Sequence, residues 1–450
     1  MAQKYKYLHL VNYNTFLLWD IKRYFMTQMA SSHPIVKLGD YIQEEGTKYN
    51  ISDKTKTYGI LGVNNQTGIF DAYEENGSKI KQKYKKMQVG WIAYNPYRVN
   101  VGSIGIRTEE HLFEYISPAY VVFSCKKGLL PEFLFLLMKT DLFNKIIREN
   151  TTGSVRQNLN YSVLSNLQIP LPSLEEQKNI VSTYNAKIEQ ANIYSLCTYR
   201  INKKIEDYLH DILETNIEFD ISGLFLNYVN YKDISRWDAL FLLSNNNIKS
   251  KYPLATLGQC ISHFLTDQNG KSLRRETYKT PEKEYTYIGM ENVKKETGEI
   301  IDNVIVKGKD IKSQTIYVPS NYFLYGKLRP YLNKYWYNNI ETQQEEIICS
   351  SEFFVFDIKN NINSKYFLYV LASYIVQKQI IDAMSGARMP RISEETFRGI
   401  QIPLPPLNIQ NEIVEHIDVL RKEQKDLQQK ALTLRQQATQ QFEQTIFSVI

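Results

Sequence analysis

The sequence contains few of the residues that build metal centres and disulfide frameworks. Its four cysteines stand far apart, and none has a CxxC or Cys/His spacing typical of zinc sites. A disulfide framework is not expected in a chain of 450 residues, so the scattered thiols indicate a reducing, cytoplasmic compartment. The six histidines are dispersed too, and no HExxH or GxSxG motif occurs. We therefore expect no bound metal. The cysteines are Cys125, Cys197, Cys260 and Cys349.

Long hydrophobic runs are also absent. No apolar run reaches the ~18 residues that a membrane span needs, and the start MAQKYKYLHL lacks the apolar core of a secretory signal. Charge is nearly balanced, with 54 Lys and Arg against 48 Asp and Glu, a net charge of +6 and a pI of about 8.7. This balance is compatible with a nucleic-acid partner but does not require one. The length of 450 residues suits two to three domains.

Two short stretches resemble enzyme motifs only in part. Asn95-Pro96-Tyr97 is similar to the (D/N)PP(Y/F) signature of DNA adenine methyltransferases, but the second proline is missing and no Gly-rich S-adenosylmethionine loop follows a strand. Gly270-Lys271-Ser272 is similar to the end of a P-loop, but Leu265 stands where the first glycine is required. We therefore expect a chain without catalytic residues.

The chain contains an internal repeat. Residues 168–181 read QIPLPSLEEQKNIV and residues 401–414 read QIPLPPLNIQNEIV, so nine of fourteen positions are identical at an offset of 233. A chain built from two copies of one unit is expected to have approximate two-fold symmetry. It would present two similar surfaces to a partner that is itself roughly two-fold symmetric, and duplex DNA is the commonest such partner.

Further matches follow in the same order in both halves. HPIVKLGDYI (33–42) corresponds to YPLATLGQCI (252–261) at an offset of 219, whereas GSVRQNLNYSVLSNLQIP (153–170) corresponds to GARMPRISEETFRGIQIP (386–403) at 233. The second half is therefore about fourteen residues longer, and we place the extra length in Thr277–Thr315, which has no clear counterpart. Similar framing segments around different middles predict one scaffold with two recognition surfaces.

Each copy of the motif leads into a long segment without Gly or Pro, Leu174–Leu213 and Leu407–Ile450. Ser173 and Glu176 have the spacing of a capping box at the first helix start. Apolar residues at heptad spacing favour a coiled coil of the two helices. Two separate helices, each packed on its own domain, are the alternative. The seam residues are Val181, Tyr184, Ile188, Ala191, Ile205, Leu209 and Ile212 in the first helix and Ile413, Ile417, Leu420, Leu427, Ala431, Leu434 and Ala438 in the second, with polar breaks at Ser195, Thr198, Asn202, Gln424 and Gln441.

The remaining segments indicate an α/β (α+β) chain. Short β-rich runs dominate each half, and each half ends with an apolar helix, over Pro131–Ile147 and Ser364–Met384. We expect two similar mixed, largely β domains. The predicted divisions are residues 1–172 (first domain), 173–216 (central helix), 217–405 (second domain) and 406–450 (C-terminal helix).

Two variable domains, each followed by "IPLP-x-L-x-x-Q-x-x-I" and a long helix, resemble the specificity (S) subunit of type I restriction-modification systems across essentially the whole chain. YNPYRVNVGSIG (94–105) is similar to a motif of such target recognition domains, and YGKLRPYLNK (325–334) is a variant of it. The resemblance implies a non-catalytic subunit for phage defence, in which two target recognition domains each read half of a split, asymmetric DNA site. The two helices would form an antiparallel coiled coil that fixes the gap.

The resemblance also implies the partners. Two adenine-N6 methyltransferase (M) subunits would dock on the chain, and restriction (R) subunits would join that complex on double-stranded DNA. This chain would bind no cofactor itself, while S-adenosylmethionine, ATP and Mg²⁺ would belong to the partner subunits. No membrane contact is implied.

DNA recognition requires cations for phosphates and side chains that reach base edges. Candidates lie in the KIKQKYKK run, in two Gly-led loops before the helix entries, in the matching YNPYR and KLRPY stretches, and in a basic cluster of the second half. Each has a structural alternative: a solvated basic face, a turn, or an internal ion pair. The candidates are Lys79, Lys81, Lys83, Lys85, Arg98, Arg156, Gln157, Asn158, Lys271, Arg274, Arg275, Lys327, Arg329, Lys334, Arg388 and Arg391.

Two other functions remain open. The chain could be a coiled-coil scaffold that binds protein partners through two adaptor domains and does not bind DNA, because the modest net charge does not exclude this. It could also be an orphan specificity subunit that serves another DNA-modifying defence system.

Overall fold

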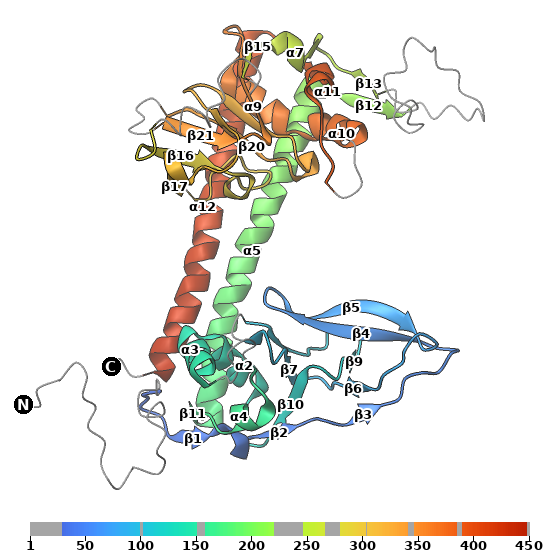
Figure 1. Ribbon diagram of the computed structural model, residues 1–450, viewed down its shortest axis with the longest axis vertical. Helices are drawn as coiled ribbons and strands as arrows, with labels where there is room; N and C mark the ends of the chain where they lie inside the picture. Colours follow the sequence, from blue (N-terminus) through green and yellow to red (C-terminus); the bar gives the residue numbers. More distant parts are fainter. Residues whose placement is uncertain are drawn as a thin grey trace, which may run out of the picture. The chain divides into compact units, whose positions relative to one another are not determined.

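The chain forms two compact units, each containing one globular domain and part of two long helices (Figure 1). Unit 1 comprises Met1–Ser195 and Gln428–Ile450, and unit 2 comprises Leu196–Leu427. Both long helices, α5 (Leu174–Leu213) and α12 (Leu407–Ile446), contribute to both units. The computed structural model describes residues 29–99, 102–150, 158–219, 246–265, 280–302, 304–340, 346–384 and 389–447.

The repeated motif forms the same short ladder in each unit. In unit 1, β1 (Ile35–Lys37) pairs antiparallel with β11 (Gln168–Pro170), and in unit 2, β14 (Leu254–Thr256) pairs antiparallel with β23 (Gln401–Pro403). The "IP" strand of the motif thus lies against the segment that begins each repeat, so these matching sequences are two strands of one ladder.

Each domain also contains a four-stranded antiparallel sheet with the same strand order. The central strands, such as Ile92–Tyr94 and Phe323–Gly326, are buried along their whole length. The order is β2-β10-β7-β8 in unit 1 and β15-β22-β19-β20 in unit 2. The bounds are β2 (Ile42–Glu44), β10 (Val121–Cys125), β7 (Ile92–Tyr94), β8 (Ile104–Ile106), β15 (Ile261–Leu265), β22 (Phe353–Ile358), β19 (Phe323–Gly326) and β20 (Tyr335–Tyr337).

A second sheet in each domain, built from the middle segments, repeats as well. The order β5-β4-β9-β6 in unit 1 matches β17-β16-β21-β18 in unit 2, with one parallel pair at the same place in each, and unit 1 adds β3 at the edge. The bounds are β3 (Lys48–Tyr49), β4 (Thr57–Asn64), β5 (Gly68–Asn76), β6 (Tyr84–Lys86), β9 (Tyr115–Ile116), β16 (Glu284–Ile288), β17 (Val304–Lys307), β18 (Thr315–Tyr317) and β21 (Glu346–Ser350).

This second sheet corrects the expectation that Thr277–Thr315 has no counterpart, because β16 and β17 occupy the places of β4 and β5. The extra length is distributed instead. The strand pairing identifies equivalent residues in the two units. The difference in residue number is 227 between Leu61 and Ile288, 231 between Ile92 and Phe323, and 233 between Phe123 and Phe356. Strand order is thus kept where sequence similarity is lost.

A pair of helices follows the last sheet strand of each domain. The sequence predicted one helix over Pro131–Ile147 and one over Ser364–Met384, but each is broken into two, at Thr140 and at Ser373. Both hydroxyls donate to a carbonyl of the preceding turn, at 2.7 and 2.6 Å, while the backbone there is extended. The helices are α2 (Pro131–Lys139), α3 (Asp141–Asn150), α4 (Tyr161–Ser165), α9 (Ser364–Ala372), α10 (Tyr374–Ala383) and α11 (Glu394–Gly399).

Shorter elements complete the described part of the chain. They are η2 (Leu38–Asp40), α7 (Leu257–Cys260), η5 (Met290–Asn292), η6 (Gly308–Asp310), η7 (Pro330–Leu332) and an antiparallel ladder of β12 (Asn216–Phe219) with β13 (Asn246–Lys249).

The glutamine of the repeated motif anchors each long helix to its domain. Gln177 and Gln410 are buried, and their amide oxygens accept a hydrogen bond at 2.8 Å from the backbone N–H of Leu130 and Asn363, respectively. Their amide nitrogens donate to the carbonyls of Pro172 and Pro405. Because a buried N–H without a partner is costly, the motif requires an amide at this position. Ser173 and Glu176 form the predicted capping box.

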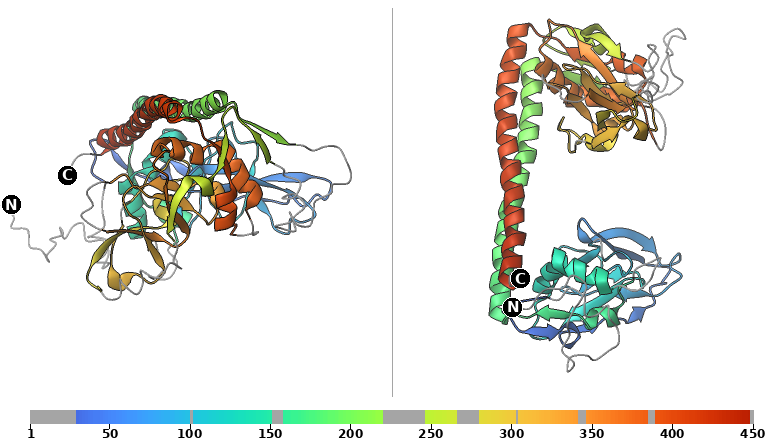
Figure 2. Two further views of the ribbon diagram at one scale, coloured as in Figure 1. Left: turned by 90° about the horizontal axis from the view of Figure 1, so that it is seen from above. Right: turned by 60° about the vertical axis from the view of Figure 1, so that its left-hand side comes forward.

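The two long helices pair antiparallel (Figure 2). In unit 1 the first half of α5 meets the second half of α12, where Tyr184 packs against Phe442, and in unit 2 the second half of α5 meets the first half of α12, where Tyr208 stacks on His416. Of the predicted seam, the residues buried are Ala191, Ile205, Leu209, Ile413, Ile417, Ala431 and Ala438, and those half-buried are Val181, Tyr184, Ile188, Ile212, Leu420, Leu427 and Leu434.

Heptad spacing placed the end of the seam one residue off. Gln441 is exposed, and Phe442 and Ile446 are buried instead. An undistorted helix has 3.6 residues per turn, so a strict heptad pattern drifts across its surface. Ile201 is also buried beside the predicted polar break.

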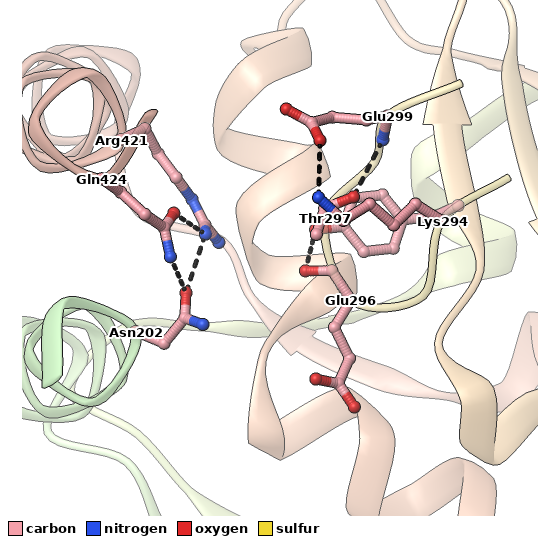
Figure 3. Close-up of polar contacts among 8 residues, drawn as sticks. Asn202, Lys294, Glu296, Thr297, Glu299, Arg421 and Gln424 are labelled. Carbon is pink, nitrogen blue, oxygen red and sulfur yellow. Dashed lines mark hydrogen bonds and ion pairs between the residues drawn. The ribbon is translucent and has the colours of Figure 1, made fainter. Parts of the chain in front are cut away.

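A polar layer interrupts the seam in unit 2 (Figure 3). The Asn202 side-chain oxygen accepts hydrogen bonds from Arg421 at 2.9 Å and from Gln424 at 2.8 Å, and Arg421 also donates to the Gln424 oxygen at 2.8 Å. Such layers limit the registers that two helices can adopt, because a shifted pairing would leave these groups without partners.

Candidate nucleic-acid interface

The loop between β7 and β8 carries the first candidate arginine. Its ends are joined by the Asn95 N–H, which donates to the Ser103 carbonyl at 3.0 Å, and the Asn95 side chain accepts from the Tyr97 N–H at 3.0 Å. Gly102 turns the chain with a φ of 83°. Arg98 and Tyr97 are exposed on this loop.

The loop between β19 and β20 has the same length and position in unit 2. The strands on both sides are offset by 231, so Arg329 is the counterpart of Arg98 and Asn333 that of Gly102. Arg329 is exposed and has a φ of 50°, a left-handed conformation that is costly for a residue with a Cβ. Its N–H is held at 2.7 Å by the Pro390 carbonyl, so the surrounding structure imposes this conformation.

Each of these loops is joined to the segment that follows the Gly-led loop. Leu159 N–H donates to the Pro96 carbonyl at 3.0 Å, and Ile392 N–H donates to the Lys327 carbonyl at 3.2 Å. Asn158 is half-buried, and its side-chain oxygen has no hydrogen-bond partner among the described residues. The described residues at the end of each Gly-led loop therefore lie beside the loop that carries Arg98 or Arg329.

The KIKQKYKK run divides into exposed and buried lysines. Lys79, Lys81 and Lys83 are exposed, and Lys79 lies 3.5 Å from Glu75. Lys85 is buried and donates to the Tyr120 carbonyl at 2.8 Å, and burial lowers the pKa of its ammonium. These contacts favour a structural role for Lys85 and leave the other three available to phosphates.

Three candidates of unit 2 are engaged within their own domain. Lys327 donates to the Ser351 carbonyl at 2.8 Å, and Lys334 donates to the Met290 carbonyl while burial lowers its pKa. Arg391 forms a two-point ion pair with Glu352, at 2.9 and 3.2 Å, which holds the pKa of that carboxyl below its usual value. Among these described candidates of unit 2, Arg329 is the one whose side chain makes no hydrogen bond or ion pair with another described residue.

Several candidates lie outside the described residues. They are Arg156, Gln157, Lys271, Arg274, Arg275 and Arg388.

Two exposed tyrosines were not selected from the sequence. Tyr97 is 56% exposed beside Arg98, and Tyr331 is 43% exposed in the loop of Arg329. An aromatic face next to an arginine suits contact with bases or sugars. Both tyrosines follow a proline in the two candidate stretches, and this position could have pointed to them. They were not singled out because the chain contains 33 tyrosines.

The described residues provide little for catalysis. They include no group of three or more His, Cys, Asp or Glu that could hold a metal ion, and burial raises the pKa of Cys125 to about 12 and that of Cys260 to about 11. No described helix combines the length and apolarity needed to cross a membrane.

Comparison with known proteins agrees with this architecture. Residues 35–193 and 260–434 match the type I restriction modification DNA specificity domain. The type I restriction enzyme EcoDI specificity subunit of Escherichia coli is 21% identical over 325 residues, which cover 71% of this chain and 68% of that protein.

One solved structure shows the same fold. One similar chain comes from a structure on the complex assembly and conformational transition of the type I R-M system. The alignment covers 93% of the present chain and 98% of that chain, with 14% sequence identity and a TM-score of 0.52. The HsdS subunit from Thermoanaerobacter tengcongensis also has 14% identity and the same coverage, with a TM-score of 0.38. Because two copies of the specificity domain account for more than half of its length, the chain belongs to the type I restriction-modification specificity subunit family.

Proposed function

We propose that this chain is the DNA sequence-specificity subunit of a type I restriction-modification complex and reads a bipartite, asymmetric site, one half with each domain. The observation that supports this proposal is the repeated recognition scaffold. Each domain presents an exposed arginine, Arg98 or Arg329, at the same place in its sheet, in loops of different sequence. Two similar scaffolds with different loops suit two different half-sites.

Each contact has a role. Arg98 and Arg329 would reach base edges, since arginine makes bidentate contacts with guanine. Lys79, Lys81 and Lys83 would contact phosphates, which position the protein without reading sequence. The chain would contribute no catalytic group.

The helix pair would serve as a spacer and a docking surface in the cytoplasm. α5 exposes Ile193, Leu196 and Tyr199, and α12 exposes Val419 and Leu432, so both present apolar side chains suited to a protein partner. Two methyltransferase subunits would dock there, and restriction subunits would join them. S-adenosylmethionine, ATP and Mg²⁺ would be bound by those partners.

The test is a selection from a random duplex library with the full chain purified with its bound subunits. We expect one bipartite motif with a fixed gap. Arg98→Ala should relax one half-site and Arg329→Ala the other, each by roughly 1–3 kcal/mol per lost base contact. Arg200→Ala, at an exposed position of α5, is the matched control and should change neither.

The alternatives predict other outcomes. A scaffold that does not bind DNA would enrich no sequence. A uniform loss of affinity for all duplexes in Arg98→Ala or Arg329→Ala would reassign that arginine to phosphate contact.

A further inference from the structure

The second helix of the pair in unit 2 receives its N-terminal cap from a long helix. The cap residue Ser373 makes no capping hydrogen bond, and its hydroxyl donates to the Val370 carbonyl at 2.6 Å. The first helical N–H, of Tyr374, donates instead to a carboxylate oxygen of Glu206 at 3.0 Å. A carboxylate at this place satisfies a free N–H and interacts favourably with the helix dipole.

Unit 1 differs at the equivalent place, because the hydroxyl of its cap residue Thr140 accepts a hydrogen bond from the Phe143 N–H at 3.3 Å. The second helix of its pair begins at Asp141, which lies 233 residues before Tyr374. The carboxyl group of Glu443 on α12 lies close enough to Asp141 to be affected by its charge and its backbone N–H. Both glutamates are half-buried, and burial raises the pKa of each carboxyl. These are therefore partly desolvated contacts and not surface charges in open solvent.

The glutamates come from the opposite repeats. α5 follows the domain of unit 1 in the sequence, but its Glu206 caps a helix of the domain in unit 2. α12 follows the domain of unit 2, but its Glu443 lies near the start of a helix of the domain in unit 1. Each domain thus meets a carboxylate from the helix that the other repeat supplies.

The same junctions hold the candidate reading loops. In unit 2 the Asn333 amide donates at 2.8 Å to the carbonyl of Ala372, the last residue of α9, and accepts from Gln377 at 2.9 Å. In unit 1 the Lys139 ammonium, on the last residue of α2, donates to the Gly102 carbonyl at 3.1 Å. Asn333 and Gly102 are the equivalent residues of the loops that carry Arg329 and Arg98.

We propose that Glu206 is a positioning residue for sequence recognition, which fixes where the domain of the other repeat holds its reading loop. This inference rests on the proposed DNA-reading function. Glu206 contacts the helix junction at Tyr374, and the junction contacts the reading loop through Ala372 and Asn333. Loss of the first contact would therefore displace the arginine of that loop without removing it. In unit 2 the charge of Arg421, itself held by Asn202 and Gln424 (Figure 3), favours the ionised form of Glu206, whereas Asp207 opposes it.

The test uses the duplex selection with the full chain and four variants: Glu206→Ala, Glu206→Gln, Glu443→Ala and Glu443→Gln. Glu206→Ala should lower enrichment of the half-site read by unit 2 by roughly fivefold, comparable to the loss of a helix cap, and leave the other half-site unchanged. Glu443→Ala should lower enrichment of the half-site read by unit 1 by less, because Thr140 already caps the helix there. The Gln variants keep an acceptor and should retain most of the enrichment. Lys203→Ala and Gln444→Ala, at exposed positions near the two glutamates, are the controls.

Hydrogen exchange separates positioning from folding. In Glu206→Ala, protection should fall at the start of α10 and persist in the core strands of unit 2. A selective change at one half-site together with this exchange pattern supports the inference. Equal losses at both half-sites, or no loss in Glu206→Ala, overturn it. Absence of any bipartite motif with the wild-type chain would instead reject the DNA-reading function itself.

Discussion

The two units have the same topology, yet the helix pair is attached to them differently. In unit 2 the helix seam and the domain share one core, in which Ile205, Leu209, Ile413 and Ile417 pack together with the residues of the central sheet. In unit 1 the buried helix residues of the domain core are Phe442 and Ile446, near the end of α12, and Val181 and Tyr184 are only half-buried against it. The repeat preserves strand order and end contacts, whereas attachment of the helices differs between copies.

The difference shows which contacts the scaffold requires. The motif glutamines make the same hydrogen bonds in both units, so they belong to the scaffold, whereas the carboxylate cap of Glu206 is a contact of unit 2. The polar layer of Asn202, Arg421 and Gln424 is found in unit 2, whereas unit 1 has a more exposed contact of Arg435 with Asn192 and Ser195. Contacts of the second kind can differ between the copies without changing the fold.

The largest effect should come from the aromatic anchor of unit 1. Phe442 is buried, with its ring centroid 5.9 Å from that of Phe133 and 6.3 Å from that of Tyr184. Phe442→Ala should destabilise unit 1 by about 3–5 kcal/mol, since it leaves a cavity that the neighbours cannot fill. Hydrogen exchange in α2 would report the loss, and exchange in α9 should not change. Leu432→Ala, at an exposed position of the same helix, should have little effect; a loss below ~1 kcal/mol for Phe442→Ala would contradict the anchor.

The motif glutamines should have matched effects in both units. Gln177→Ala and Gln410→Ala each leave a backbone N–H without its partner, so each should cost about 1–3 kcal/mol in denaturant unfolding. Gln436→Ala, exposed on α12, serves as the control. A large effect in one unit and none in the other would show that the shared motif does not have a shared role.

The polar layers should differ in strength. A double-mutant cycle with Asn202→Ala and Arg421→Ala should give a coupling of about 0.5–3 kcal/mol, because the contact is partly buried. The cycle with Asn192→Ala and Arg435→Ala should give less than about 0.5 kcal/mol at its exposed position. Equal couplings would remove the distinction between the two halves of the helix pair.

The smallest effect concerns the ion pair of Arg391 with Glu352, whose counterparts in unit 1 are Asn158 and Ala119. Arg391 lowers the pKa of Glu352 in the folded chain, so the pair stabilises unit 2 above the unfolded pKa of ~4.3 and loses this effect as pH falls through the folded value. The pair is partly exposed, so we expect less than about 1 kcal/mol. Glu352→Gln should reduce the acid sensitivity of unit 2 in unfolding measured across this pH range. An unchanged pH profile would contradict this contribution.

Much of the scaffold could be predicted from the sequence, because repeated motifs and helix periodicity are local signals. The repeat, the start and end of α5, and the capping box at Ser173 all follow from short spacings. The break at Thr140 did not follow, because a hydroxyl that bonds to the preceding turn has no distinctive sequence pattern. The sequence did not reveal that β16 and β17 are the counterparts of β4 and β5, because the same strand pairing can form from different side chains.

The candidate surface was predicted less completely. Arg98 and Arg329 were matched by their motifs, and the structure places them at equivalent loop positions. Lys85 is buried whereas its neighbours in the same run are exposed. The sequence of the run could not show this, because the burial of Lys85 involves a contact with the distant Tyr120. The cap that Glu206 supplies to Tyr374 joins residues 168 positions apart, so no local pattern could reveal it.

The most direct test of the account is long-read methylome sequencing of the native host and of a strain that lacks this chain. We expect loss of one bipartite N6-methyladenine motif, with all other motifs intact, and both half-sites would be read from that motif. If no motif is lost from a host in which the chain is expressed with its subunits, the chain does not direct DNA modification and the account is contradicted.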